Sequence, residues 1–380
     1  MQASASKALP TETRYWTTLT DDQLLEVAFH ADDPTTLSDV VLDLPSSEET
    51  PTVEFAYNTK DGAGRKVRCI HCRYDNHNRG FVLRFKDGRR ILVGKDCGKK
   101  IYGANFDLIE RDFDAARDRA GYIRRQRAIR AAAPGFIQAM GSLLVHPSLM
   151  GFRDLRRSFN RSLPELARLT ADACCRQGGA MMVEEKVRDL KAEVRREEQM
   201  EIEADRLARM TKTARKRAID DGAVMRPGKK LKPIYMTTFR AVGQIEGTAF
   251  FMTIEEPPDE ALKVLIPAMV GVLNKLDADR LTNSQYRSIF GEITRKLDDI
   301  ERQMERLQAP LAAFELGNLS RMAEWGTRNA QDGGVYKAEL GGITWKTPGR
   351  DEPSAVYCPK DYRPPSQQPI KAFRAIVSAL

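Results

Sequence analysis

The sequence predicts an α-rich, multidomain α+β protein. A small zinc-stabilised module with a β-hairpin and a treble-clef-like layout is expected near the N-terminus, followed by a long helical body that contains a coiled coil. Three observations predict this fold class. Cys and His cluster around a basic hairpin between Cys69 and Cys97, apolar residues recur at helical spacing after Asn105, and an apolar seam with alternating steps of three and four runs from Phe290 to Phe314.

The chain has 380 residues and 42% hydrophobic content, enough to bury two or three cores. We expect five segments along it. They are an acidic α-rich lead (1–50), a basic zinc-binding α+β module (51–104), a helical domain (105–180), long helices with a β-hairpin insert at about 233–254 (181–330), and a C-terminal hairpin with a Pro-rich tail (331–380).

The lead and the first strands follow from local signals. Thr20 is a good N-cap for a helix over 21–30, whose first turn carries two Asp at the positive end of the helix dipole. Residues 52–57 alternate as a strand. Together with residues 65–68 and the hairpin that follows, this strand predicts a small antiparallel sheet around the metal.

Cys69, Cys72, His77 and Cys97 are the predicted ligands of one structural Zn²⁺. Two thiolates separated by two residues can reach a tetrahedral ion from a tight turn, and an imidazole with a third thiolate closes a Cys3His shell. His71, between the first two Cys, is the competing fourth ligand. The alternative to a metal site is that these thiols are ordinary buried core residues.

The stretch from Cys69 to His77 resembles the first three ligands of the retroviral-type zinc knuckle. In that family the fourth ligand is a Cys a few residues after the His, whereas residues 78–90 of this chain contain none. Cys97 is instead expected at or just before a helix that begins near Lys99. The resemblance therefore covers nine residues and implies no more than a shared turn geometry.

The residues between His77 and Cys97 read as a hairpin. Strands 80–86 and 89–94 are joined by Asp-Gly, which suits a two-residue turn with positive φ. Counting back from this turn places Phe85 opposite Arg90 and Leu83 opposite Leu92. One face would then hold the apolar residues Phe81, Leu83, Phe85 and Leu92.

Further along the chain, helical periodicity predicts long helices over 183–219 and through the seam at 290–314. The seam residues are Phe290, Ile293, Leu297, Ile300, Met304, Leu307, Leu311 and Phe314. Pro310 should kink or interrupt this helix. We expect the seam to pack against 183–207 of the same chain, or against a second copy in a homodimer. Between the long helices, 234–242 and 248–253 are expected to form a hairpin.

The charge of the chain is uneven although its formal net charge is only +8. Residues 1–60 carry three Lys/Arg against eleven Asp/Glu, whereas 65–100 carry twelve against three. Such a basic block favours phosphate binding, because cation contacts gain from counterion release. The expected nucleic-acid contacts are Arg84, Lys86, Arg89, Arg90 and Lys99. An intramolecular alternative is that the acidic lead docks on this face. A second basic block at 206–232 is either a similar surface or a solvated helix face.

Other function classes find little support. Six Cys in so long a chain indicate a reducing compartment, and no apolar run approaches the about eighteen residues of a membrane span, so we expect a soluble cytoplasmic protein. No phosphate loop, His-Glu-x-x-His motif or nucleophile with an assignable His is present, although the carboxylates of a nuclease can be dispersed in sequence. The expected function is non-enzymatic, zinc-dependent binding of DNA or RNA. The alternative is a protein-interaction scaffold or inhibitor in which zinc is only structural.

Overall fold

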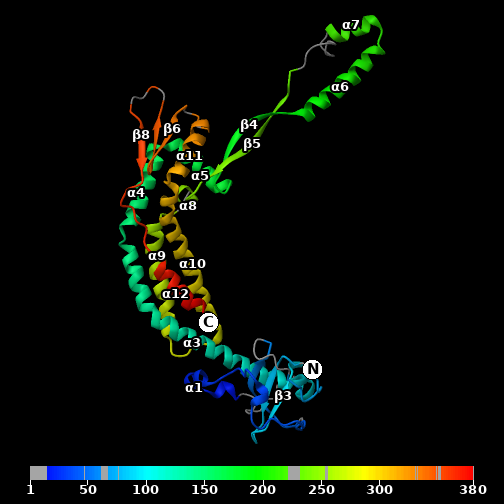
Figure 1. Cartoon of the computed structure of the whole chain (residues 1–380), viewed down its shortest axis with the longest axis vertical. Helices are drawn as coiled ribbons and strands as arrows, with labels where there is room; N and C mark the ends of the chain where they lie inside the picture. The colour runs from blue at the N-terminus through cyan, green and yellow to red at the C-terminus, as the bar shows by residue number, and fades with distance from the viewer. Residues whose placement is uncertain are drawn as a thin grey trace, which may run out of the picture. The chain divides into compact units, whose positions relative to one another are not determined.

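The structure is a computed structural model, and it confirms an α-rich protein with small β-sheets (Figure 1). The described residues are 15–46, 48–60, 67–75, 77–220, 232–252, 256–329, 331, 333–347, 349 and 352–379. They group into two compact units, each assembled from separate stretches. Unit 1 comprises Met1–Leu143, Lys263–Glu301 and Ser366–Leu380, and unit 2 comprises Leu144–Leu262 and Arg302–Pro365.

Unit 1 opens with short helices and a three-stranded antiparallel sheet in the order β1-β2-β3. Thr20 caps the first α-helix as predicted, in a reciprocal capping box with Gln23, although the helix is shorter than expected. The elements are η2 (Trp16–Thr18), α1 (Asp21–Glu26), η3 (Pro34–Thr36), β1 (Thr52–Asn58), β2 (Arg79–Arg84), β3 (Arg90–Val93) and α2 (Lys95–Tyr102). Residues 65 and 66 of the remaining predicted strand lie outside the described residues.

The predicted register of the β2–β3 hairpin was wrong by one residue. Leu83 pairs with Ile91 rather than with Leu92. The loop holds three residues, because the Phe85 N–H donates to the Arg89 carbonyl (2.9 Å) and Gly88 takes a left-handed conformation at φ +94°. This is the loop type in which a turn is followed by a glycine bulge, and Asp-Gly in the sequence does not distinguish it from the two-residue turn.

The corrected register separates the sheet into two apolar faces. Leu92 joins Val82, Tyr57 and Val67 in a small cluster on one face. The other face packs against the start of α3 (Ala104–Leu144) in a larger core. Its buried members are Trp16, Leu24, Phe29, Val53, Leu83, Phe85, Ile91, Val93, Tyr102, Phe106, Ile109, Phe113, Ala116 and Ala120.

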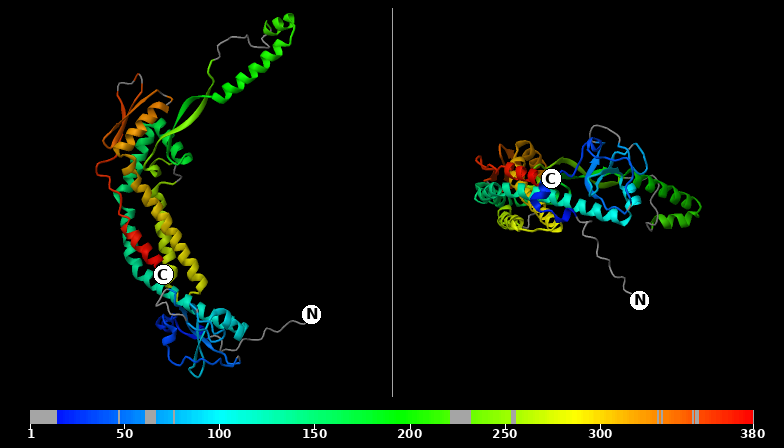
Figure 2. Two further views of the ribbon diagram at one scale, coloured as in Figure 1. Left: turned by 45° about the vertical axis from the view of Figure 1, so that its right-hand side comes forward. Right: turned by 90° about the horizontal axis from the view of Figure 1, so that it is seen from below.

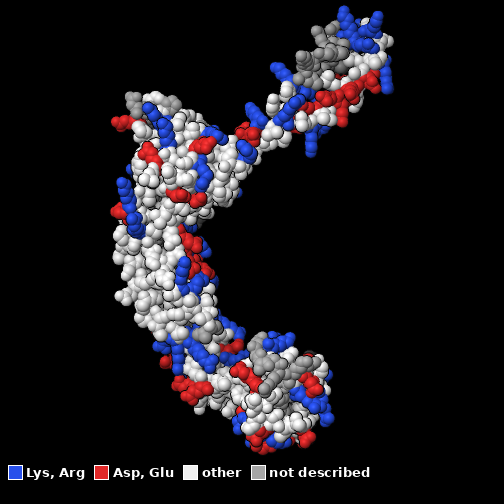
Figure 3. All heavy atoms as spheres, viewed as in Figure 1, with Lys and Arg blue, Asp and Glu red and all other residues white. Residues whose placement is uncertain are grey.

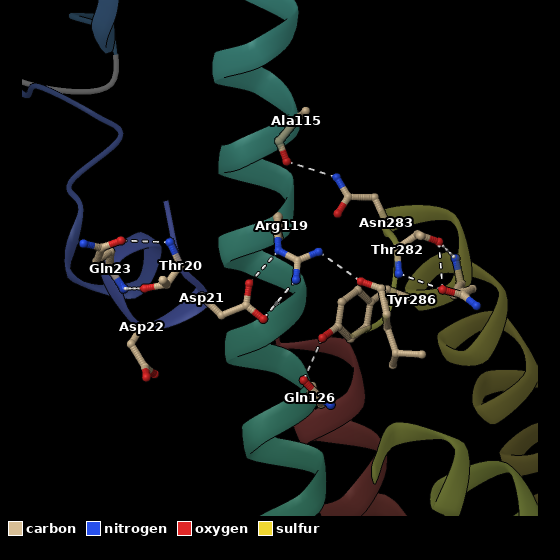
Figure 4. Close-up of polar contacts among 12 residues, drawn as sticks. Thr20, Asp21, Asp22, Gln23, Ala115, Arg119, Gln126, Thr282, Asn283 and Tyr286 are labelled. Atoms are coloured by element: carbon tan, nitrogen blue, oxygen red, sulfur yellow. Dashed lines mark hydrogen bonds and ion pairs between the residues drawn. The ribbon is translucent and has the colours of Figure 1, made fainter. Parts of the chain in front are cut away.

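Polar contacts join α3 to its neighbours in unit 1 (Figure 4). Arg119 of α3 binds the Asp21 carboxylate of α1 through Nε (2.6 Å) and one terminal nitrogen (3.0 Å), and its other terminal nitrogen donates to the Leu281 carbonyl (3.0 Å). About two turns further along α3, the buried Tyr286 hydroxyl donates to Gln126 (2.8 Å). Because bidentate charge-assisted bonds fix the orientation of both partners, Arg119 holds α1 against α3.

The rest of unit 1 is helical. Residues of α9 (Pro258–Asn274), η4 (Lys275–Asp277) and α10 (Asn283–Ala313) pack with α3, and α12 (Gln368–Ser378) lies beside α3 and α10 (Figure 2). Phe373 of α12 stacks on Phe136 at 4.2 Å between ring centroids, and Arg374 pairs with Asp298 (2.6 Å) and Glu301 (2.7 Å). With Ile370, Phe373 and Val377 buried, α12 is part of the core.

Unit 2 has an aromatic centre and two small sheets. Phe159, Phe250, Phe251 and Phe314 contact one another at 5.1–6.3 Å between centroids. The elements are α4 (Pro147–Ser162), α5 (Pro164–Arg176), β4 (Ala180–Arg188), α6 (Leu190–Ala208), α7 (Lys212–Asp220), β5 (Tyr235–Gln244), α8 (Thr248–Phe251), α11 (Leu316–Asn329), β6 (Val335–Glu339), β7 (Gly342–Lys346) and β8 (Ser354–Tyr357). The C-terminal hairpin is confirmed as β6–β7, with β8 as a third, unpredicted strand.

Two predictions in the middle of the chain were wrong. Residues 183–188 belong to β4 instead of a long helix, and 248–251 form α8 instead of a strand. The partner of β5 is β4, with Val183 paired to Arg240. The apolar spacing in 183–194 fits a helix, but strand pairing with a segment about fifty residues away overrides this local preference.

The predicted seam is buried, but its partner differs from the expectation. Leu297 is 0% exposed, whereas Leu311 is 49% exposed. Helix α10 also continues through Pro310 to Ala313 without interruption. Ile202 of the expected partner is 63% exposed, so this part of 183–207 does not cover the seam. Helix α10 is thus a long helix with one buried face, and residues of the same chain cover that face.

Within the described part of the chain, one helical stretch, Ala104–Ser162, which includes α3 and α4, is apolar enough over one window to cross a membrane by length and composition alone. Core helices of soluble proteins pass the same test, and a single such helix is weak evidence for a span.

Candidate metal centre

The structure brings Cys69, Cys72, His77 and Cys97 together. One ligand atom from each lies within 4.8 Å of the other three, and this is the only such group found among the described residues. In a tetrahedral zinc site the ligand atoms are about 3.3 to 3.8 Å apart, given metal–ligand bonds of about 2.0 to 2.3 Å. The four residues could therefore close around an ion with a small contraction. His77, not the exposed His71, is the imidazole of this cluster.

A tight turn presents the first two thiols. The Arg73 N–H donates to the Cys69 carbonyl (2.9 Å), and the Cys69 N–H donates to the Tyr74 carbonyl (3.2 Å). Arg73 takes a left-handed φ of 55°, which lets the chain reverse directly after Cys72. Next to the turn, the Ile70 N–H donates to a β3 carbonyl at 3.0 Å, which fixes the turn to the sheet.

His77 is fixed by its backbone and by its ring. Its N–H and carbonyl exchange two hydrogen bonds of 3.1 Å with Val67. The ring Nδ1 lies 3.2 Å from the Arg79 carbonyl and donates to it. This bond fixes the tautomer that leaves Nε2 as the ligand atom, the arrangement that metal-binding histidines usually have.

The third thiol arrives on a helix. Strand β3 ends at Gly94, and Cys97 lies in the first turn of α2. Gly98 packs directly on the Phe106 ring, so that α2 sits close to α3. The β2–β3 hairpin thus returns the chain from His77 to Cys97 at the same end of the sheet.

The two buried thiols differ in acidity. Burial opposes ionisation of Cys69, but backbone hydrogen bonds from Cys72, Gly94 and His71 together hold its pKa below the ordinary value. For Cys97, burial raises the pKa to about 12, and the neighbouring thiols add to the effect. Ligand thiols must be deprotonated, so an ion bound here displaces a tightly held proton from Cys97.

The immediate surroundings also fit a bound cation. The Tyr57 hydroxyl is buried without a hydrogen-bond partner among the described residues. Burial, and then the negative charges that the three cysteines carry when ionised, raise the pKa of Tyr57. A divalent ion would offset that buried negative charge, since three thiolates and one neutral imidazole leave a net charge of only −1 around it. The donor set and its surroundings therefore fit Zn²⁺.

Gly94 makes room for the imidazole. A Cβ at this position would overlap the His77 ring, although its backbone φ of −75° suits any residue. We expect Gly94→Ala to displace His77, to lower zinc affinity in competition with a chromophoric chelator, and to destabilise unit 1 by about 1 to 3 kcal/mol. The control is Gly121→Ala in α3, where a Cβ meets nothing within 4 Å and helix propensity favours Ala by up to about 1 kcal/mol. Full zinc affinity in Gly94→Ala would contradict this role.

Four of the predicted nucleic-acid contacts, Arg84, Lys86, Arg89 and Arg90, lie at the loop end of the β2–β3 hairpin, and Lys99 lies on α2. Several of them have acidic partners. Arg84 and Arg90 stand opposite each other on β2 and β3, and both bind Glu54, the extra residue of a β-bulge in β1. Arg90 makes two bonds to Glu54 (2.6 and 2.9 Å), and Arg84 makes one (3.3 Å). Because like charges directly opposite on a sheet repel, Glu54 has a structural role.

The remaining predicted contacts are also engaged. Arg89 pairs with Glu49 (2.8 Å) and with Asp87, and Lys99 pairs with Asp107 (2.8 Å). The side chain of Lys86 is exposed. Glu49 belongs to the acidic lead, so part of that lead does dock on the hairpin, as the intramolecular alternative predicts, whereas Glu54 lies in β1 of the module itself.

Three other cations surround the ligands without such partners. Arg73 follows Cys72, Arg79 begins β2 just after His77, and Lys100 lies one helical turn after Cys97. All three are exposed, and no ion pair joins them to any part of the chain that the structure describes. Sequence reasoning counted them in the basic block but did not separate them from the paired arginines, because the partners come from other strands.

Comparisons with known proteins add no family to this picture. No family model matches the chain, and neither the curated proteins nor the solved structures contain a significant match to it.

Proposed function

We propose that this chain is a non-enzymatic, zinc-containing protein that binds nucleic-acid phosphates next to its metal centre. The observation that carries the proposal is the set of exposed, unpaired cations Arg73, Arg79 and Lys100, each within three residues of a candidate ligand. A structural ion fixes the backbone at all three, so little conformational entropy is lost when phosphates bind. Cations held in this way are suited to phosphate contacts that position a protein without reading sequence.

The paired cations take secondary roles in this proposal. Exposed ion pairs contribute about 0 to 1 kcal/mol, so Arg84, Arg89 and Lys99 can exchange a carboxylate for a phosphate at little cost. Arg90 differs, because its side chain and that of Glu54 are both only 15% exposed. We assign Arg90 to the structure of the sheet, and Lys86 remains a candidate contact.

The test is charge reversal of two unpaired cations. We expect Arg79→Glu with Lys100→Glu to weaken binding of random-sequence oligonucleotides similarly for all sequences, and to flatten the salt dependence of log K by about one unit per lost duplex contact. Binding is measured by fluorescence anisotropy at several salt concentrations, with zinc content checked in parallel.

The control for this test is Lys360→Glu with Lys371→Glu, which removes the same charge from exposed positions elsewhere. Arg84→Glu with Arg89→Glu is a weaker test, because it also breaks the pairs with Glu54 and Glu49. Parental affinity and salt slope in the Arg79 and Lys100 variant would reject the proposed contacts.

A second candidate function is a protein-interaction scaffold or inhibitor with a purely structural metal. Its supporting observation is that Glu49 and Glu54 already form ion pairs with three hairpin arginines within the chain. Absence of any oligonucleotide binding at low salt, with zinc bound and the fold intact, would favour this candidate over the first.

A further inference from the structure

Unit 2 carries an extended arm, which we define as β4, α6, α7 and β5 (Figure 1). Its base is anchored to the rest of unit 2. Trp325 of α11 donates its indole N–H to the Met182 carbonyl (2.9 Å), and the Ile245 N–H donates to the Gly179 carbonyl (2.8 Å). Gly179 has a φ of +90°, which suits the turn into the ribbon.

Beyond this base the arm has little cover. All five residues from Glu184 to Arg188 are exposed, and most of β5 is exposed as well. A two-stranded ribbon without a packed face is marginally stable and buries little apolar surface. The outer part of the ribbon therefore contributes few residues to the core of unit 2, and its exposed side chains are available to a ligand.

The end of the arm is strongly basic. Its cations at the end of α6 and on α7 are exposed and have no ion-pair partner among the described residues; they are Arg206, Arg209, Lys212, Lys216 and Arg217. Arg215 is used differently, because it donates to the Leu207 (2.8 Å) and Ala208 (3.2 Å) carbonyls at the end of α6. Figure 3 shows cations gathered over α7 and carboxylates along α6. A polyanion is thus attracted to the tip and repelled from α6.

One face of the ribbon adds aromatic rings to this charge. Tyr235 is 59% exposed and Phe239 is 67% exposed, and they share a face of β5 because they are four residues apart. Between them on the same face, Lys186 of β4 stands opposite Thr237 and has no ion-pair partner among the described residues. On the same face Glu184 stands opposite Phe239, and Arg188, opposite Tyr235, is paired with Glu193 (2.8 Å), so Lys186 supplies the unpaired positive charge between the two rings. Exposed aromatic rings beside such a cation are suited to the stacking of unpaired bases.

We propose that the arm binds single-stranded nucleic acid, with phosphates at the α7 tip and bases stacked on Tyr235 and Phe239. This inference rests on the proposed function for the class of ligand but assigns it a second, separate site. Duplex nucleic acid would use the cations and leave the rings exposed, because its base faces are already stacked. An acidic protein would likewise leave the rings unexplained.

The first test reverses the charge of the tip in the full-length protein. We expect Lys212→Glu with Lys216→Glu and Arg217→Glu to weaken binding of a labelled single-stranded oligonucleotide. The salt slope should flatten by about 0.7 for each lost contact, thus by about 2 in total. The charge-matched control, Lys263→Glu with Lys360→Glu and Lys371→Glu, changes exposed cations outside the arm and should keep most of that slope.

The second test removes the rings. Tyr235→Ala and Phe239→Ala should each weaken single-strand binding by about tenfold, because one stacked base contributes about 1 to 3 kcal/mol. Duplex binding should change far less. Met236→Ala is the control, since Met236 is also exposed but lies on the opposite face of β5. Far-UV circular dichroism verifies that each variant keeps the helical content of the parent.

The outcomes separate this inference from the proposed function. If the tip and ring variants bind as the parent does while the Arg79 and Lys100 variant is impaired, the arm proposal is wrong and the metal-centre proposal stands. The reverse pattern rejects the metal-centre contacts and retains the arm. Tip variants that lose duplex and single-strand binding equally, with rings that have no effect, would overturn the single-strand assignment. A parent protein that binds no oligonucleotide at low salt would overturn both proposals.

Discussion

The purified protein is expected to contain one Zn²⁺ per chain, and Cys69→Ser or Cys97→Ser should lose it. Either change leaves three ligands for an ion that needs four, and it leaves a cluster whose geometry the ion no longer fixes. Elemental analysis of protein prepared without chelator measures the stoichiometry. Cys175→Ser is the matched control, because this thiol is exposed and lies outside the cluster.

The structural consequence of metal loss should be local. The apolar cluster on the metal side of the sheet has only four buried members, whereas the opposite face shares a large core with α3. Binding free energy of a structural ion is folding free energy for whatever it holds together. We therefore expect faster hydrogen exchange in residues 67–77 and near Tyr57, while Phe106 and Phe113 remain protected. A folded preparation without zinc, or equal zinc loss in Cys175→Ser, would contradict the assignment.

The four members of the Cys/His cluster could be brought together from the sequence because their arrangement is local. Cys69 and Cys72 are close in any tight turn, and His77 lies within reach of that turn. An antiparallel hairpin after His77 returns the chain to the same end of the sheet and so brings Cys97 close to the other three residues, whichever of the two registers it has. A one-residue error moved Leu92 to the wrong face, yet it did not change where the hairpin ends. The type of hairpin loop therefore affected the prediction of which residues are in the core, but not the prediction of which residues form the Cys/His cluster.

The charge interpretation depended on contacts that sequence does not contain. The count of cations was correct, but Glu54 reaches Arg84 and Arg90 from a different strand through a β-bulge. Whether a cation is paired is a property of strand order and register. Arg79 and Lys100 became the better candidates only once these pairs were known.

Helical periodicity identified a buried face but not its neighbour. The spacing from Phe290 to Phe314 predicted burial correctly at seven of its eight positions, with Leu311 as the exception. It could not say that α3 and α12 supply the contacts in unit 1. The same pattern at Val183 and Val187 was misread, because β4 acquires its partner from a segment about fifty residues away.

Truncation of the seam should have a large effect on stability. Leu297 is fully buried in α10, whose first turns contact α3 through Tyr286 and whose Asp298, next to Leu297, contacts α12. Leu297→Ala removes most of a buried side chain and leaves a cavity, so we expect a loss of about 2 to 5 kcal/mol in the free energy of unfolding. Leu297→Asp should cost more, because it also buries an unpaired charge.

The matched control is Leu311→Ala, a chemically identical truncation on the same helix at a half-exposed position. It should change the free energy of unfolding by less than about 0.5 kcal/mol, since little apolar area returns to water. Urea unfolding followed by circular dichroism gives the difference between the two variants, and hydrogen exchange of unit 1 peptides locates it. Equal effects at both positions would mean that the seam is not the buried face of α10. A loss confined to unit 2 would mean that Leu297 does not stabilise α10 against α3 and α12.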